Sequence, residues 1–179
     1  MSDKPSYLGL LNSIAVGEAG GEELFCAWAS VTPSPDVKAV LEAVMLREGE
    51  HAKSFAKRIN ELGYSVLPRE DPNQKSRVAI AASTTLSDCE KFSQLAVGVA
   101  PKNGTDVFAK FMDDLTIDVQ TGQLMGRYIA EERDSNRMLQ SCRAIVEAEM
   151  NGSSNNGTAE LEARLGRIEQ ALEQLLAKA

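Results

Sequence analysis

The stretch Glu48-Gly49-Glu50-His51 contains the only histidine of this 179-residue chain and lies in a segment with helical periodicity. Glu48 and His51 are three residues apart, so on an α-helix their side chains point to the same side and can bind one metal ion. Burying a carboxylate or an imidazole without a partner is costly. The stretch therefore predicts helices that pack around a polar, metal-binding site.

Two segments carry stripes of apolar or small residues at three- and four-residue steps. The stripe of the first segment, interrupted only by Glu18, is Tyr7, Leu11, Ile14, Glu18, Gly21, Phe25 and Trp28. The stripe of the second is Val37, Leu41, Val44, Glu48, His51, Phe55 and then Ile59 or Leu62. This spacing predicts two amphipathic helices, each of which buries a face with acidic members.

Chain breakers delimit four long helical stretches. Thr32-Pro33-Ser34-Pro35 ends the first, Asp36 is the expected N-cap of the second, and Gly63 is its expected C-cap. We expect helices over about 5–31 and 36–63, a third that ends near Pro101 after a connection at 64–72, and a fourth from about 105 to 150. Without a strand pattern, this order predicts an all-α fold with a four-helix bundle over residues 1–150.

The predicted turn at 32–35 lies about midway between Glu18 and Glu48. In an antiparallel hairpin the two carboxylates therefore face each other at the same height, with His51 one turn away. Two buried carboxylates at one height repel each other unless they share a proton or a cation. A bound metal ion is the expected solution.

The second half of the predicted bundle offers further acids. Its stripes are Leu86, Glu90, Ser93 and Val97 on the third helix, and Phe108, Phe111, Leu115, Asp118, Gly122, Met125 and Ile129 on the fourth. Glu90 and Asp118 are the acidic members, and Asp88 matches the height of Asp118 slightly better than Glu90 does. Thr121 stands where a second Glu-x-x-His motif would place its histidine.

The order carboxylate, Glu-x-x-His, carboxylate, carboxylate on four successive helices resembles the ferritin-like superfamily. Gly17-Glu18-Ala19 and the stretch Arg47-Glu48-Gly49-Glu50-His51-Ala52-Lys53 are similar to rubrerythrin-type sequences. The resemblance covers roughly Tyr7 to Met150 and is closest over the first two helices. It implies a site for iron, or alternatively manganese, that reacts with dioxygen or peroxide.

Carried over to this chain, the resemblance implies that Glu18 and His51 bind one ion and that Glu48 bridges. Glu90 or Asp88, together with Asp118, would hold a second ion. One or two ions are therefore expected, in a di-metal oxidoreductase of ferroxidase or peroxidase type. Because the second histidine is missing, the alternative is a non-catalytic bundle with a degenerate site that serves as an oligomeric interaction module.

Other residues near these stripes have simpler interpretations. Tyr128 is expected in the core, and Glu131-Glu132-Arg133-Asp134 is expected to be a solvated face. Gly17, Gly20 and Gly21 lie around Glu18, although a mid-helix glycine costs roughly 1 kcal/mol relative to alanine. Either close helix packing or an open pocket beside the metal could compensate for this cost.

The end of the sequence differs in composition. Residues 151–157, Asn-Gly-Ser-Ser-Asn-Asn-Gly, predict a flexible linker. Over residues 158–179 the seam Leu161, Leu165, Ile168, Leu172 and Leu175 predicts a short coiled-coil helix. Such a helix is marginal alone, so we expect it to form a homo-oligomer or, alternatively, to dock on a surface of its own bundle.

Composition excludes several classes. A formal charge of −7 argues against nucleic-acid and anionic-membrane partners, and no apolar run reaches membrane-spanning length. Cys26, Cys89 and Cys142 are widely spaced and odd in number, which argues against a disulfide framework. With no signal-peptide pattern, a cytoplasmic protein is expected.

Overall fold

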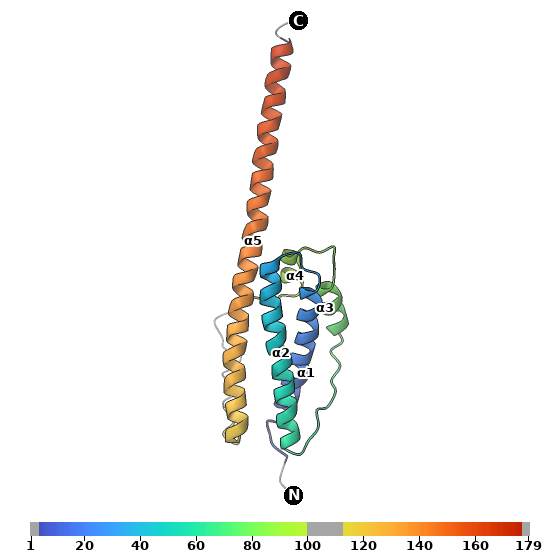
Figure 1. The fold of residues 1–179 in the computed structure, drawn as a ribbon, viewed down its shortest axis with the longest axis vertical. Coiled ribbons are helices and arrows are strands. Elements are labelled where there is room, and N and C mark those ends of the chain that lie inside the picture. Colours follow the sequence, from blue (N-terminus) through green and yellow to red (C-terminus); the bar gives the residue numbers. More distant parts are fainter. Residues whose placement is uncertain (1–3, 100–112, 177–179) are drawn as a thin grey trace. The chain divides into compact units, whose positions relative to one another are not determined.

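Helices make up the regular structure of the chain (Figure 1). The computed structural model describes the backbone of residues 4–99 and 113–176, and the side chains of 4–99 and 113–150. The helices are α1 (Leu8–Ala29), α2 (Pro35–Glu61), α3 (Gln74–Ala81), α4 (Asp88–Gln94) and α5 (Val119–Leu176). Because no strand occurs within the described backbone, the predicted all-α class is confirmed.

The chain divides into two compact units, Met1–Arg143 and Ala144–Ala179, and every contact described below belongs to the first. Helix α5 extends through 151–157, where the sequence predicts a linker. Helix-favouring residues on both sides carry the backbone through this segment, although each glycine in it costs about 1 kcal/mol. The predicted coiled-coil seam, Leu161 to Leu175, lies outside the described side chains. In the described part of the chain, no helix is long and apolar enough to cross a bilayer.

The first hairpin forms close to its predicted limits. Ser34, rather than Asp36, is the N-cap of α2, because its hydroxyl accepts the N–H of Val37 at 3.3 Å. Pro35 follows at the first helical position, where a missing N–H costs nothing. After the end of α2, Gly63 has a φ of +84°, the left-handed conformation expected of a residue that terminates a helix.

The predicted stripes of α1 and α2 are buried, and they pack together with α5. One core cluster contains Tyr7, Leu8, Leu11, Ile14, Ala15, Phe55, Ile59, Met125, Tyr128 and Ile129. Each large apolar side chain removed from water in this way contributes about 1.5–3 kcal/mol. Glu18 and His51 are buried in the same stripes, which places polar groups in a setting where they need partners.

Helices α1 and α5 run in the same direction, and α2 runs against both. Asp118, just before α5, contacts Tyr7, just before α1, and further along the two helices Tyr128 contacts Glu18. Arg58, near the end of α2, also contacts Asp118 at the start of α5. This arrangement brings the middle of α1, α2 and α5 to the same level.

The third predicted helix is replaced by two short helices, α3 and α4. Between them the hydroxyl of Ser83 accepts the N–H groups of Thr85 and Leu86. Ser87 then forms a capping box with Glu90 and starts α4. Because these hydroxyl groups bind backbone N–H groups locally, they compete with a continuous helix.

Helix α5, the counterpart of the fourth predicted helix, begins at Val119, and the predicted start near residue 105 lies outside the described residues. Asp118 causes the start at Val119, since its carboxylate accepts the N–H of Thr121 at 3.0 Å in the manner of an N-cap. Leu115, expected on the buried stripe, is 96% exposed. Two other members of that predicted stripe, Phe108 and Phe111, lie outside the described residues.

Candidate metal centre

Three helices bring carboxylates to the single imidazole of the chain. Glu18 of α1, His51 of α2 and Glu132 of α5 each offer one ligand atom, and these atoms all lie within 4.8 Å of one another. The Nδ1 atom of His51 is 3.2 Å from Oε2 of Glu18 and 3.3 Å from Oε1 of Glu132. Glu18 and His51 are buried, and Glu132 is partly buried. The cluster therefore combines carboxylate oxygens with one imidazole nitrogen, a set that could hold a divalent metal ion.

Glu48 adds a third acidic group, one turn before His51 on α2. Its carboxylate lies against Gly21 of α1, where an added Cβ would come within 2.1 Å of Oε2. Burial, followed by the neighbouring charges of Glu18 and Glu132 and a hydrogen bond to Glu18, raises the pKa of Glu48 to about 9. Without a metal, Glu48 is therefore protonated at neutral pH, and one proton is shared where a cation could stand.

A second glutamate and glycine pair has the opposite arrangement, with the glutamate on α1 and the glycine on α2. Glu22 of α1 lies against Gly49 of α2, and a Cβ at Gly49 would be 2.3 Å from its Oε1 atom. Glu22 also pairs with Lys53 at 3.6 Å. Each helix thus offers a glycine to a glutamate of the other, so close packing explains Gly21 and Gly49.

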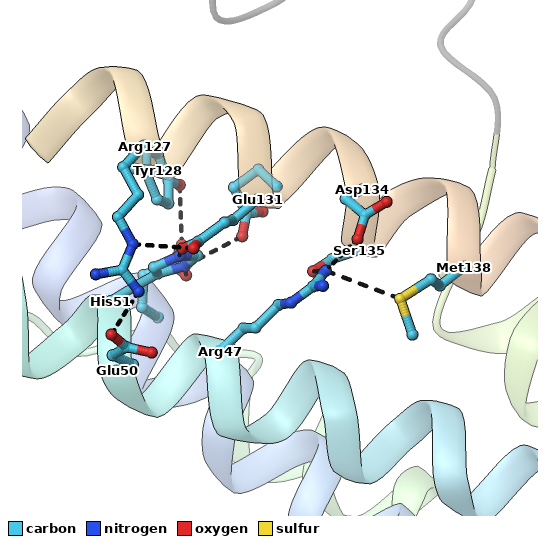
Figure 2. Close-up of polar contacts among 11 residues, drawn as sticks. Arg47, Glu50, His51, Arg127, Tyr128, Glu131, Asp134, Ser135 and Met138 are labelled. Atoms are coloured by element: carbon cyan, nitrogen blue, oxygen red, sulfur yellow. Dashed lines mark hydrogen bonds and ion pairs between the residues drawn. The ribbon is translucent and has the colours of Figure 1, made fainter. Parts of the chain in front are cut away.

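The other ring nitrogen of His51 faces outward, toward Glu131 of α5 (Figure 2). Nε2 lies 2.8 Å from Oε2 of Glu131, whose Oε1 accepts the Nε–H of Arg127 at 2.9 Å. Arg127 also binds Glu50 of α2. Burial acts to raise the pKa of Glu131, but the hydrogen bonds from Arg127 and His51 outweigh it and lower the pKa. Glu131 is therefore an ionised carboxylate held between a guanidinium and the imidazole.

The carboxylates around His51 favour its charged form. Burial lowers the pKa of the imidazole, but the surrounding carboxylates of Glu132, Glu18 and Glu131 outweigh this effect and raise the pKa to about 10. In the metal-free protein both ring nitrogens therefore carry protons at neutral pH. A bound metal ion would replace the proton on one of these two nitrogens.

Tyr128 of α5 completes the inner wall of the cluster. Its hydroxyl donates a hydrogen bond to Oε1 of Glu18 at 2.9 Å, and its ring packs edge-on to those of His51 and Phe55. Burial and the nearby carboxylates raise the pKa of Tyr128 well above its usual range. The phenol therefore stays protonated and fixes one oxygen of Glu18.

One atom of the cluster lacks a hydrogen bond. Oε1 of Glu132 is buried and has no hydrogen-bond partner, although it lies 3.3 Å from Nδ1 of His51. Leaving a buried carboxylate oxygen unsatisfied costs about 1–3 kcal/mol or more. Nδ1 also faces Glu18, so one donor serves two acceptors. A cation bound among these atoms would satisfy both oxygens, and the residues present fit a metal ion.

Asp118, which the sequence predicts as a metal ligand, lies outside this cluster. It binds Tyr7 at 2.7 Å and Arg58 at 2.8 Å and accepts the hydroxyl of Thr121 at 2.6 Å. Burial acts to raise its pKa, but the hydrogen bonds from Thr121, Tyr7 and Arg58 hold the pKa below the usual range. Asp118 thus starts α5 and ties it to α1 and α2.

Glu90 and Asp88 also lie elsewhere. Glu90 is exposed, and its carboxylate accepts the N–H and hydroxyl of Ser87 in the capping box of α4. Asp88 is buried and accepts hydrogen bonds from Trp28 at 2.7 Å and Thr32 at 2.6 Å. Glu90 thus caps α4, and Asp88 ties the first turn of α4 to the end of α1.

Asp118 and Asp88 lie near opposite ends of α1 and are too far apart to bind the same ion. Asp118 contacts Tyr7 at one end of α1, whereas Asp88 contacts Trp28 near the other end. At 1.5 Å per residue the two anchor points are about 30 Å apart. The predicted equal height assumed two uninterrupted helices, and the breaks before α4 and α5 remove that basis.

Glu131 and Glu132 are not part of the solvated face that the sequence predicts, since both lie against His51. Glu132 lies three residues after Ile129 and therefore continues the predicted stripe of the fourth helix. Extending that stripe by one step would have found it. Glu131 has no such signal, because its role depends on the rotation of α5 against α2. Tyr128 is buried as expected, with a polar contact that the apolar pattern does not predict.

Comparison with known proteins finds no family model, no curated protein and no solved structure that matches this chain.

Proposed function

We propose that this chain is a ferritin-like metal-binding protein whose native ion is iron. The observation that carries the proposal is the convergence of Glu18, His51 and Glu132 between three helices, with Glu48 beside Glu18 and a buried oxygen of Glu132 that has no hydrogen bond. Protons and one imidazolium balance the cluster in the metal-free state. A divalent cation balances the same charges with stronger bonds to oxygen and nitrogen.

The path of the chain supports the bundle topology in this proposal. Helix α2 runs against α1, and α5 runs with it. Asp88 lies near the carboxyl end of α1, and Asp114 lies near its amino end, where it accepts a hydrogen bond from Ser6. The two acids therefore lie near opposite ends of α1, and residues 100–112, which fall between them in the sequence, are outside the described part.

The cluster supports one ion as the primary site. Glu18, His51 and Glu132 would hold it, and Glu48 would be the fourth donor after losing its proton. Bound iron would supply the redox chemistry, either oxidation of the ferrous ion or reaction with dioxygen or peroxide. Tyr128 keeps Glu18 oriented by its hydrogen bond, and the surrounding apolar side chains exclude water.

The test is anaerobic titration with Fe²⁺, and with Mn²⁺ in parallel, followed by metal analysis. We expect a ratio near one ion per chain and at least a hundredfold loss of affinity in His51→Ala, which removes the nitrogen donor. Glu90→Gln is the control, because its amide can still close the capping box and it lies outside the cluster. A ratio near zero would favour the non-catalytic scaffold, and a ratio near two with sensitivity to Glu90 would restore the two-ion site.

We further propose that the protein is a homo-oligomer held partly by its C-terminal segment. Deletion of Asn151 to Ala179 is expected to lower the mass of the assembly, or its stability to dilution, while metal binding is unchanged, since the cluster lies within Met1–Arg143. Light scattering over a dilution series checks this. Identical masses for the truncated and full-length proteins would show that the segment does not mediate assembly.

A further inference from the structure

The two nitrogens of His51 have different surroundings. Nδ1 faces two carboxylates of the metal cluster, Glu18 at 3.2 Å and Glu132 at 3.3 Å. Nε2 faces a single carboxylate, that of Glu131, at 2.8 Å. Since the lone pairs of an imidazole diverge, only one nitrogen can reach an ion placed among Glu18, Glu48 and Glu132.

Glu131 is a poor candidate for a metal ligand because both of its oxygens are engaged. Oε2 binds Nε2 of His51, and Oε1 accepts the Nε–H of Arg127. The guanidinium balances its negative charge. Glu132 is its opposite, with a buried oxygen that has no hydrogen bond.

We propose that Glu131 is a positioning residue for the metal centre, which accepts the Nε2 proton of His51 and so directs the lone pair of Nδ1 at the ion. The inference rests on the proposed function and assigns Nδ1 as the metal-binding atom. A carboxylate on the far nitrogen fixes both the tautomer and the rotation of a metal-binding imidazole and raises its basicity.

The position of Glu131 is itself fixed from two helices. Arg127 lies one turn before it on α5 and binds Glu50, which directly precedes His51 on α2 (Figure 2). The chain of contacts runs from α2 through Arg127 and Glu131 and back to α2. This link holds the imidazole in one orientation before an ion arrives.

A chain with one histidine makes this inference directly testable, because ¹⁵N-labelled histidine gives signals from one imidazole. The probe is Zn²⁺, which is diamagnetic. In the zinc-loaded protein, long-range ¹H–¹⁵N spectra are expected to show a metal-bound Nδ1 and a protonated Nε2. Glu131→Ala is expected to weaken Zn²⁺ binding about 10–100-fold, the usual effect of losing such a partner.

Two further variants separate positioning from simple loss of charge. Glu131→Gln keeps an oxygen that can accept the Nε2 proton, so its tautomer should match the wild type and its affinity should be nearer to it than that of Glu131→Ala. Glu42→Gln removes an equal charge from an exposed site on α2 and should change neither readout.

The outcomes distinguish this inference from the proposed function. Zinc bound at Nε2, or equal affinities for Glu131→Ala and wild type, would overturn the role of Glu131 and leave the metal centre standing. Failure of the wild type to bind Zn²⁺, Fe²⁺ or Mn²⁺ would overturn both.

Discussion

Raising the pH from about 7 to about 8.5 is expected to destabilise the metal-free protein through two groups that hold protons in the fold. Each such proton changes the free energy of unfolding by about 1.4 kcal/mol per pH unit. Glu48 and His51 together should therefore lower the free energy of unfolding by about 2.7 kcal/mol per pH unit. Glu48→Gln is expected to halve this slope, because glutamine resembles the protonated acid and does not titrate.

The direction of the change follows from where each pKa moves on folding. The pKa of Glu48 rises from 4.5 to about 9, so between these values the folded chain binds a proton that the unfolded chain releases. The pKa of His51 rises from 6.5 to about 10, so its contribution to stability is complete below 6.5 and is lost as the pH rises toward 10. Both effects act together between about pH 6.5 and about pH 9.

Urea unfolding in the presence of a chelator, at several pH values, measures the slope. Other titrating groups contribute equally to wild type and variant, so the difference between the two slopes isolates Glu48. Glu42→Gln is the control for loss of an acid on the same helix and should keep the wild-type slope. With saturating Mn²⁺ the trend should weaken, because metal binding releases the protons and strengthens as the pH rises. Equal slopes for wild type and Glu48→Gln would show that Glu48 is ionised in the fold.

The sequence predicts the first hairpin and its polar residues well, because they depend on local periodicity. The three- and four-residue spacing around Glu18, Glu48 and His51 predicts which face of each helix is buried. The helix-breaking residues 32–35 set the relative height of the two helices. Burial of Glu18 and His51 and the contact between them agree with that prediction. The local spacing of apolar residues and the position of one turn were sufficient to predict this hairpin.

The second half was predicted less well because its helices start at polar contacts rather than where the periodicity begins. Ser87 and Asp118 each bind backbone N–H groups and fix the first residues of α4 and α5. The heights of the side chains on α4 and α5 therefore depend on these contacts and not on the apolar periodicity alone. Glu132 therefore reaches His51, while Glu90 and Asp118, expected at that level, lie elsewhere.

The glycines around Glu18 allowed two interpretations from sequence, and the structure separates them by position. A Cβ at Gly17 would meet nothing within 4 Å, whereas a Cβ at Gly21 would lie 2.1 Å from Oε2 and 2.8 Å from Cδ of Glu48. Gly21 therefore makes room for a carboxylate of the cluster. Gly17, on the same helix, does not make room for another side chain in this way.

Substitution of these two glycines by alanine should consequently give different results. Gly17→Ala is expected to raise the free energy of unfolding by up to about 1 kcal/mol, since alanine favours the helix, with metal affinity unchanged. Gly21→Ala brings the same helical preference but displaces Glu48 from its place beside Glu18. We expect it to gain less stability and to lose at least tenfold in metal affinity, about 1.4 kcal/mol.

Metal titration and urea unfolding of both variants, each compared with wild type, measure the two effects separately. A drop in affinity without a drop in metal-free stability cannot come from general unfolding, so it would identify Glu48 as a metal ligand placed by a glycine. If Gly21→Ala matches Gly17→Ala in both measurements, Glu48 does not contribute to the site, and the ion is held by Glu18, His51 and Glu132 alone.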